Sequence, residues 1–326
     1  MNFRKAALAF PLDWAHRRPY VLASIANPGE GPYFIEWDPG NGTYGEDWDD
    51  SRHDAHGVLL ERSGGFHAIR IAQYALHLHA RWLQTNDDRY RSRFLAQARW
   101  LRSHQEREPV PGTYRFSFAW PKYGAGVGWN SGMAQGEAIS ALLRAESTDP
   151  GNGYAEAAWE AATPFTRDLA GGGVVWSNGR DTFFEEVFSA RVAPHILNGC
   201  IYGLWGLWEL WRVAPEAWSG VAIERCVETL KRWVTLFDTG WWTSYSLMRT
   251  RTDRPHLATL KYHAFHIAQM RVLAAMFDEP AFANAAERWE SYARSPRDRT
   301  RMLLETAASF PARVLHYDTV AGGAHA

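Results

Sequence analysis

The stretch ILNGCIYGLWGLWELW, residues 196–211, decides the fold class of this chain. Apolar or small residues fill most of its positions. A helix that is apolar nearly all round is buried on most of its sides. The following segment, Pro215–Phe237, is more amphipathic, as is typical of an outer helix. The two segments together predict a helical hairpin with a buried inner helix.

The same hairpin pattern occurs four times. The predicted pairs are His67–Thr85 with Asp88–Gln105, Ser131–Glu146 with Gly153–Asp168, Ile196–Val213 with Pro215–Phe237, and Tyr262–Asp278 with Pro280–Ala293. Their first helices start about 65 residues apart, and a last helix, Asp298–Phe310, follows. This repeat predicts a mainly α fold: an incomplete α/α toroid of four helical hairpins. Short β segments are expected between the hairpins, within Thr113–Trp129, Gly171–Phe188 and Asp238–Thr250.

Composition limits the domain count and the classes of function. The chain has 326 residues, of which 46% are hydrophobic, enough for one large core. We assign residues 57–326 to the toroid, and residues 1–56 to a small irregular N-terminal region with short strands. A formal net charge of −1 gives no global basic field, which argues against nucleic-acid binding.

The sequence also predicts where the protein resides. No stretch is long enough to span a bilayer. The apolar run at the N-terminus stops at Pro11, too short for the core of a secretory signal. We therefore expect a cytoplasmic protein.

The sequence favours neither a metal nor a cofactor. Cys200 and Cys226 stand in apolar helical patterns, as expected of buried free thiols. His263 and His266 lack the glutamate of an H-E-x-x-H zinc motif. The acidic patch at residues 47–54 lacks EF-hand spacing, which favours a solvated loop over a calcium loop. A phosphate loop, a dinucleotide fingerprint and a nucleophile elbow are absent from the sequence.

Each inner helix carries one amide at a comparable place. These amides are Gln73, Gln135, Asn198 and Gln269. Amides both donate and accept hydrogen bonds, which suits the hydroxyls of a sugar polymer. They can equally satisfy neighbouring backbone groups, and the sequence leaves both readings open.

Two carboxylates interrupt the Phe- and Val-rich run Phe183–Phe188. In an extended segment, the side chains of Glu185 and Glu186 point to opposite faces. One can face a groove while the other pairs with an arginine such as Arg180 or Arg191. Because a carboxyl among aromatic rings has a raised pKa, it is a competent proton carrier near neutral pH. A purely structural ion pair is an equal alternative.

Two tyrosines follow at short range. Alternation puts Trp241, Thr243 and Tyr245 on one face of an extended segment. Helical spacing puts Tyr262, His266 and Gln269 on one face of the next helix. A single buried tyrosine is usually a core residue. Two tyrosines and a glutamate from successive arms of one toroid predict an active site.

In this order, the stretches resemble the C-terminal catalytic domain of the D-glucuronyl C5-epimerases, which turn glucuronate into iduronate within heparosan-type polysaccharides. The similar stretches cover most of residues 55–280: Gly65–His77, Ser131–Ala145, Phe184–Glu186, His195–Leu210, Phe237–Leu247 and Tyr262–Gln269. The family's catalytic domain is an α/α toroid, in agreement with the repeat.

The resemblance implies roles for individual residues. Glu186 matches the family's catalytic glutamate, and Tyr245 and Tyr262 match its two catalytic tyrosines. An acidic polysaccharide is the implied partner, and a homodimer is the implied assembly. The candidate substrate-binding residues are Gln73, Tyr74, Asn130, Gln135, Arg180, Asn198, Trp241, Arg249, His266 and Gln269.

The chain also departs from the family pattern. Val187 stands where a tyrosine commonly follows the glutamate, and Met248 stands where the animal enzymes carry an arginine, with Arg249 one residue later. Phe66-His67-Ala68 replaces an aromatic-Tyr-Pro sequence. Most of the large N-terminal β-domain of the animal enzymes has no counterpart here. These departures leave the exact polymer open.

Epimerisation at C5 needs two proton carriers on opposite faces of the sugar and positive charge at its carboxylate. The hypothesis pairs Glu186 with Tyr262, while Tyr245 stabilises the intermediate or relays the proton. Arg249 or Arg180 would hold the carboxylate. A polysaccharide lyase, which expels the 4-oxygen from the same intermediate, is the first alternative. A non-catalytic glycan-binding toroid is another. A glycoside hydrolase pairing Glu185 or Glu186 with Asp238 ranks below the lyase.

Overall fold

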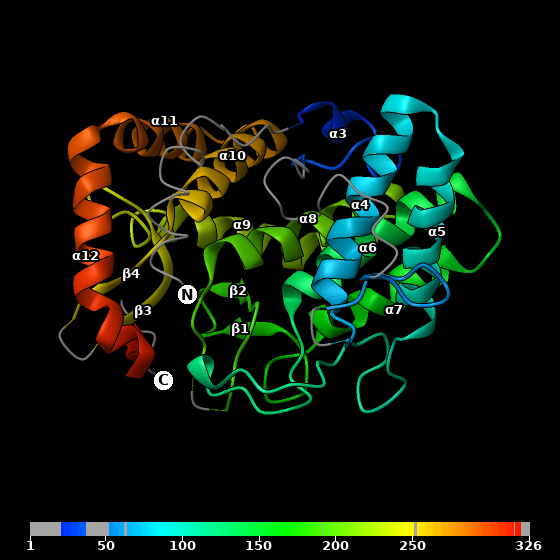
Figure 1. The fold of residues 1–326 in the computed structure, drawn as a ribbon, viewed down its shortest axis with the longest axis horizontal. Coiled ribbons are helices and arrows are strands. Elements are labelled where there is room, and N and C mark those ends of the chain that lie inside the picture. Colours follow the sequence, from blue (N-terminus) through cyan, green and yellow to red (C-terminus); the bar gives the residue numbers. More distant parts are fainter. Residues whose placement is uncertain are drawn as a thin grey trace.

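The structure of the protein is a computed structural model that describes residues 21–36, 52–61, 64–190, 192–250, 253–315 and 317–320. Within these ranges the chain is mainly helical, as predicted (Figure 1). No helix in this described part is both long and apolar enough to cross a membrane.

All eight predicted hairpin helices are confirmed, with ends shifted by a few residues. The first helices of the hairpins are α4 (Ala68–Thr85), α6 (Gly132–Thr148), α8 (Leu197–Val213) and α10 (Leu260–Phe277). The second helices are α5 (Asp88–Ser103), α7 (Tyr154–Ala162), α9 (Ala217–Trp233) and α11 (Pro280–Arg294). The predicted last helix is α12 (Pro296–Leu315).

Local signals explain where these helices begin and end. Ser131 and Thr259 accept hydrogen bonds from backbone N–H groups in the first turns of α6 and α10. Asn86 and Asp278 take left-handed conformations just after α4 and α10. Beyond α7 the predicted helix gives way to the 3-10 turn η4 (Thr163–Thr166), which contains a proline.

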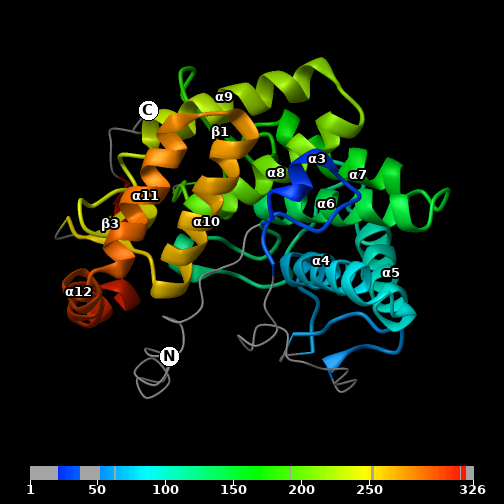
Figure 2. The same cartoon turned by 90° about the horizontal axis from the view of Figure 1, so that it is seen from above.

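The first helices of successive hairpins pack against one another: α4 on α6, α6 on α8, and α8 on α10. Each also packs against its own partner, α5, α7, α9 or α11. Seen from above, the first helices follow one another in an arc, with the partner helices on its outer side (Figure 2). The mainly α fold is therefore confirmed, while the complete toroid stays a prediction.

The strands are short and lie between the hairpins. Strands β1 (Val175–Ser177) and β2 (Thr182–Phe184) form an antiparallel hairpin, and β3 (Ser244–Thr250) pairs antiparallel with both β4 (Pro255–Leu257) and β5 (Tyr317–Val320). The expected β segments in Gly171–Phe188 and Asp238–Thr250 are thus present.

Thr113–Trp129 differs from the expected strand character. It holds one isolated bridge, between Trp120 and Ala125, around the 3-10 turn η3 (Pro121–Tyr123). Pro121 starts this turn, and Gly124 and Gly128 adopt positive φ angles. These conformations favour turns over a regular ladder.

Much of the N-terminal region predicted to contain short strands lies outside the described residues, at 1–20 and 37–51. The described part, residues 21–36, holds the short helix α3 (Ala23–Ala26) and packs into the main core. Arg144 and Glu209 form a fully buried ion pair beneath it, at 2.8 Å. Glu209 also accepts a 3.1 Å hydrogen bond from the N–H of Gly29. The segment is therefore attached to both α6 and α8.

Helices α6 and α8 touch backbone to backbone. A Cβ atom added at Gly206 would lie 2.0 Å from the carbonyl oxygen of Gly136, and one added at Gly136 would lie 2.3 Å from that of Tyr202. Real Cβ atoms do not approach backbone oxygen this closely, so only glycine fits at these positions. The separation of the two helices is set by these contacts.

We expect Gly206→Ala to lower the free energy of unfolding by about 3 kcal/mol or more, because the added methyl must push the two backbones apart. Urea denaturation measures this change. Gly65→Ala is the matched control, since a Cβ at Gly65 meets no atom within 4 Å. Equal stability of the two variants would contradict the contact.

Candidate active site

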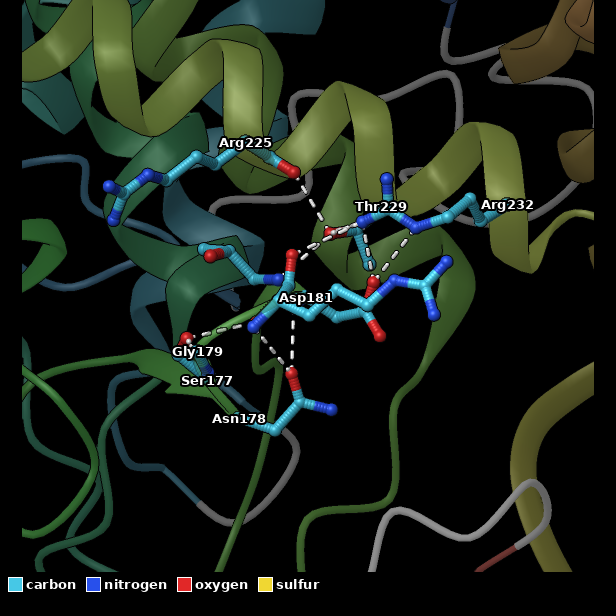
Figure 3. A network of polar contacts seen from close by, with 9 residues as sticks. Ser177, Asn178, Gly179, Asp181, Arg225, Thr229 and Arg232 are labelled. Carbon is cyan, nitrogen blue, oxygen red and sulfur yellow. Dashed lines mark hydrogen bonds and ion pairs between the residues drawn. The ribbon is translucent and has the colours of Figure 1, made fainter.

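The β1–β2 hairpin, which leads into the two glutamates, is bound to the side of α9 (Figure 3). Arg232 of α9 donates to the Oδ1 atom of Asp181 at 3.0 Å. The N–H of Thr182 donates to Thr229 Oγ1 at 2.8 Å, and that hydroxyl donates to the carbonyl of Arg225. These bonds determine where the chain leaves β2, immediately before the glutamates.

Glu185 is held by the backbone and side chain of one histidine. Its carboxylate contacts His195 Nδ1 and accepts from the His195 N–H at 3.1 Å. The expected arginine partner is therefore replaced by His195: Arg180 lies exposed on the β1–β2 turn, and Arg191 lies outside the described residues. The buried pair joins the end of β2 to the start of α8, a structural role.

Glu186 lies beside a different part of α8. A Cβ atom added at Gly199 would lie 2.4 Å from the Oε2 atom of Glu186, so the absent side chain of Gly199 makes room for the carboxyl. Asn198 Nδ2 donates to the same oxygen at 3.5 Å. Glu186 lines a pocket of about 200 Å³. The other lining residues are His67, Ile69, Arg70, Gln73, Trp120, Met133, Asn198, Tyr202, Lys261, Tyr262 and Phe265.

One of the two predicted catalytic tyrosines lines this pocket, and the other packs against it. Tyr262, half-buried in the first turn of α10, is among the lining residues. The ring of Tyr245, from β3, meets that of Tyr262 edge to face, with 4.6 Å between their centroids. The structure therefore brings Glu186, Tyr245 and Tyr262 to one place.

The ionisation of these groups is strongly affected by their surroundings. Burial, with a contribution from Glu185, raises the pKa of Glu186 to about 8, against the opposing charge of Lys122. Burial and the charge of Glu186 raise the pKa of Tyr262 to about 12, while a hydrogen bond with Tyr245 acts in the opposite direction. The same factors, burial first, raise the pKa of Tyr245 well above its usual value. Near neutral pH, Glu186 can hold or release a proton, and both phenols are proton donors.

The four inner-helix amides differ in whether they face the pocket or only satisfy groups of the fold. Gln73 and Asn198 line the pocket, and Gln73 Nε2 donates to Glu137 Oε1 at 3.0 Å. Gln269 Nε2 donates to the carbonyl of Asn198 at 3.1 Å. Gln135 bonds only to backbone groups, donating to Gly112 and Ala161 and accepting from Tyr114. Hence two amides face the pocket, and Gln135 serves the fold.

Three other predicted substrate-binding residues lie inside the helical core. Tyr74 stacks on His77, and Asn130 Nδ2 donates to the carbonyl of Gly172 at 2.9 Å. His266 Nδ1 contacts Thr243 Oγ1 at 3.1 Å, and burial lowers the pKa of this histidine to about 3. None of the three is among the lining residues of the pocket.

Three more lie on other surfaces. Trp241 packs near α12, where the guanidinium of Arg301 stands 4.1 Å from its ring centroid. Arg249 pairs with Asp253 at 3.3 Å, and Arg180 stays on the exposed turn described above. The geometry therefore does not bring either candidate arginine to Glu186.

The pocket also contains residues that the sequence did not single out. Arg70 precedes Gln73 by three positions and Tyr202 follows Asn198 by four, so helical spacing was the available signal for these two residues. Lys261 is adjacent to Tyr262 and carried no such signal. Trp120 comes from an irregular loop and carried no such signal. Glu137, fully buried behind Gln73, has a pKa raised far above its usual value by burial.

The predicted buried free thiols are confirmed, whereas most of the acidic patch at residues 47–54 lies outside the described residues. Cys200 and Cys226 are buried free thiols with sulfurs 3.6 Å apart. Asp54 accepts from the N–H groups of His56 and Val58 in a turn, while Asp47, Asp49 and Asp50 lie outside the described residues. Within the described ranges, no group of three or more His, Cys, Asp or Glu side chains is placed to hold a metal ion.

The helical array thus places a buried carboxyl and one phenol in the lining of a single pocket, with a second phenol packed against the first. The family model described as the D-glucuronyl C5-epimerase C-terminus matches residues 107–291, and the chain belongs to this family. The D-glucuronyl C5-epimerase of Caenorhabditis elegans is 29% identical over 188 residues, which are 52% of this chain and 30% of the worm protein. The alignment thus spans less than a third of that relative.

The raised pKa of Glu186 predicts a pH dependence of stability. The folded protein holds this proton up to about pH 8, whereas an unfolded glutamate holds it only up to its ordinary value of 4.5. Between these limits the folded state binds more protons, so stability falls as pH rises. We expect the unfolding free energy of the wild type, relative to Glu186→Gln, to fall by up to about 1.4 kcal/mol per pH unit over this window.

Urea unfolding at half-unit pH steps measures the difference. Exposed Glu224→Gln on α9 controls for the response of the assay to pH. A wild-type curve that runs parallel to that of Glu186→Gln from pH 4.5 to 8 would show that Glu186 titrates normally.

Proposed function

We propose that this protein is a uronate C5-epimerase, an isomerase that converts D-glucuronate to L-iduronate within a heparosan-like polysaccharide. One observation carries the proposal: Glu186 and Tyr262 line one pocket, and the ring of Tyr245 lies against that of Tyr262. Membership of the D-glucuronyl C5-epimerase family supports the same reaction.

The proposed reaction removes the C5 proton on one face of the sugar and returns a proton on the other. Glu186 and Tyr262 are the two carriers. With a pKa of about 8, Glu186 is available in both protonation states near neutral pH. The hydrogen bond with Tyr245 lowers the pKa of Tyr262, the direction required if this phenol is to give up its proton. Tyr245 stabilises the intermediate or relays the proton, and its hydrogen bond would also stabilise the phenolate of Tyr262.

The remaining pocket residues fit an acidic sugar. Arg70 and Lys261 give the lining positive charge, although Arg70 is also paired with Glu61 at 3.0 Å. Gln73 and Asn198 can bond to sugar hydroxyls. Trp120 and Phe265 add aromatic surface of the kind that packs on a sugar ring. A homodimer remains an expectation from the resemblance, and the cytoplasmic location remains one from the sequence.

We expect Glu186→Gln and Tyr262→Phe each to reduce deuterium incorporation at C5 by a factor on the order of 10² to 10⁴, because each removes one proton carrier. NMR of heparosan incubated with the protein in heavy water measures the exchange and the iduronate formed. Glu224→Gln and Tyr90→Phe, both on outer helices, are the matched controls.

Full exchange in both active-site variants would contradict the assignment of the carriers. Growth of an ultraviolet band from an unsaturated uronate would instead indicate a lyase, which expels the 4-oxygen from the same intermediate. Binding of heparosan without exchange by the wild type would indicate a non-catalytic glycan-binding protein.

Gly199→Ala tests the placement of the carboxyl without altering its chemistry. The new methyl would overlap Glu186 Oε2, at 2.4 Å, and displace it. We expect the exchange rate to fall at least about tenfold, because a misplaced carrier loses its alignment with the reacting carbon. Gly126→Ala, where a Cβ meets nothing within 4 Å, is the control. Unchanged exchange in Gly199→Ala would mean that the carboxyl does not act from this position.

A further inference from the structure

The proposed reaction requires positive charge where the uronate carboxylate becomes enolate-like. Arg249 and Arg180, the arginines suggested by the sequence, do not line the pocket. Of the cations that do line it, Arg70 is paired with Glu61 at 3.0 Å, and Lys261 stands 5.9 Å from the ring centroid of Phe265. A further cation near Glu186 is therefore a candidate for this charge.

Lys122 lies on the η3 turn, two residues beyond the pocket residue Trp120. Its Nζ atom is 3.1 Å from the Nε2 atom of His256, on β4. It also stands 5.1 Å from the ring centroid of Tyr123. The lysine therefore links the irregular loop before α6 to the β3–β4 hairpin.

His256 connects this ammonium to the strand that carries Tyr245. Its ring meets that of Tyr245 edge to face, at 5.1 Å between centroids. Its Nδ1 atom is 2.8 Å from Ser246 Oγ. Because an ammonium group only donates hydrogen bonds, Nε2 of His256 accepts from Lys122 and Nδ1 carries the proton toward Ser246. The imidazole ring is thereby placed to align the cation.

The ammonium of Lys122 affects the ionisation of Glu186, one of the two proposed proton carriers. The charge of Lys122 lowers the pKa of Glu186, opposing the effects of burial and of Glu185. The neighbouring Tyr123 contributes to the raised pKa of Tyr245. Residues of the η3 turn are therefore close enough to Glu186 and to Tyr245 to influence a substrate bound beside them.

We propose that Lys122 is a catalytic residue whose ammonium stabilises the C5 enolate through the uronate carboxylate, and that His256 is its positioning residue. This inference rests on the proposed epimerase activity. It assigns to Lys122 the function that the sequence suggested for Arg249 or Arg180.

Lys122→Met keeps the length of the side chain and removes its charge. We expect kcat for C5 exchange to fall on the order of 100-fold, as when one charge-stabilising donor is removed from an active site. Lys122→Arg should keep at least about a tenth of the wild-type rate, and ethylammonium should restore part of the rate to Lys122→Ala in a saturable way. Lys231→Met, on α9 and ion-paired with Glu228, is the control.

His256→Phe keeps the ring contact with Tyr245 but cannot accept from Lys122. We expect it to lower kcat about tenfold in the wild type and to have no further effect in Lys122→Met, because coupled residues are not additive. A residue that only supports the fold would lower the rate equally in both backgrounds.

The outcomes separate this inference from the proposed function. If the wild type fails to exchange C5 hydrogen, the epimerase proposal fails. If the wild type exchanges and Lys122→Met retains its kcat, the lysine assignment alone is overturned. A rise in KM with unchanged kcat would likewise overturn it, since the charge would then serve binding only. Because Lys122 is exposed, unfolding temperatures close to the wild type are expected for its variants.

Discussion

The contact between the backbones of α6 and α8 is the constraint on which the rest of the structure depends. Glycines at facing positions remove the side chains that would otherwise separate the helices by a full layer. The close approach also orients the chain that enters α8. The N–H of Gly132, in the first turn of α6, donates to the carbonyl of Glu185 at 2.7 Å, while Gly199 leaves space for the next side chain, Glu186. The α6–α8 pair thus sets the spacing of two core helices and also the direction of the Glu186 side chain.

Two adjacent glutamates perform different tasks because extended backbone sends neighbouring side chains to opposite sides. Glu185 meets the backbone and ring of His195, so its charge is compensated by direct contacts. Glu186 enters a pocket among aromatic rings and one weak amide contact, so its charged form is disfavoured. The same residue type thereby joins two segments in one place and carries a raised pKa in the next.

The sequence predicted the helices well because their apolar spacing is a local property repeated four times. It also predicted which carboxyl and which two phenols converge, with the family resemblance indicating their roles. It did not predict which cation lies near Glu186, because the position of a residue on a strand does not reveal the partner of its side chain. Arg249, for example, pairs with Asp253. Nor did it identify Trp120 or Lys122, since an irregular loop has no periodicity to interpret. For Gln135, the local pattern fitted a sugar ligand and a backbone partner equally.

The lining of the pocket runs from His67 to Phe265 along the chain and draws on α4, α6, α8, α10 and the loops before α6 and α8. Contacts between such distant segments carry a large loop-closure entropy and form late in folding. The pocket of a growing polypeptide is therefore incomplete until α10 has docked. Synthesis of the last hairpin is the step that supplies the remaining lining residues.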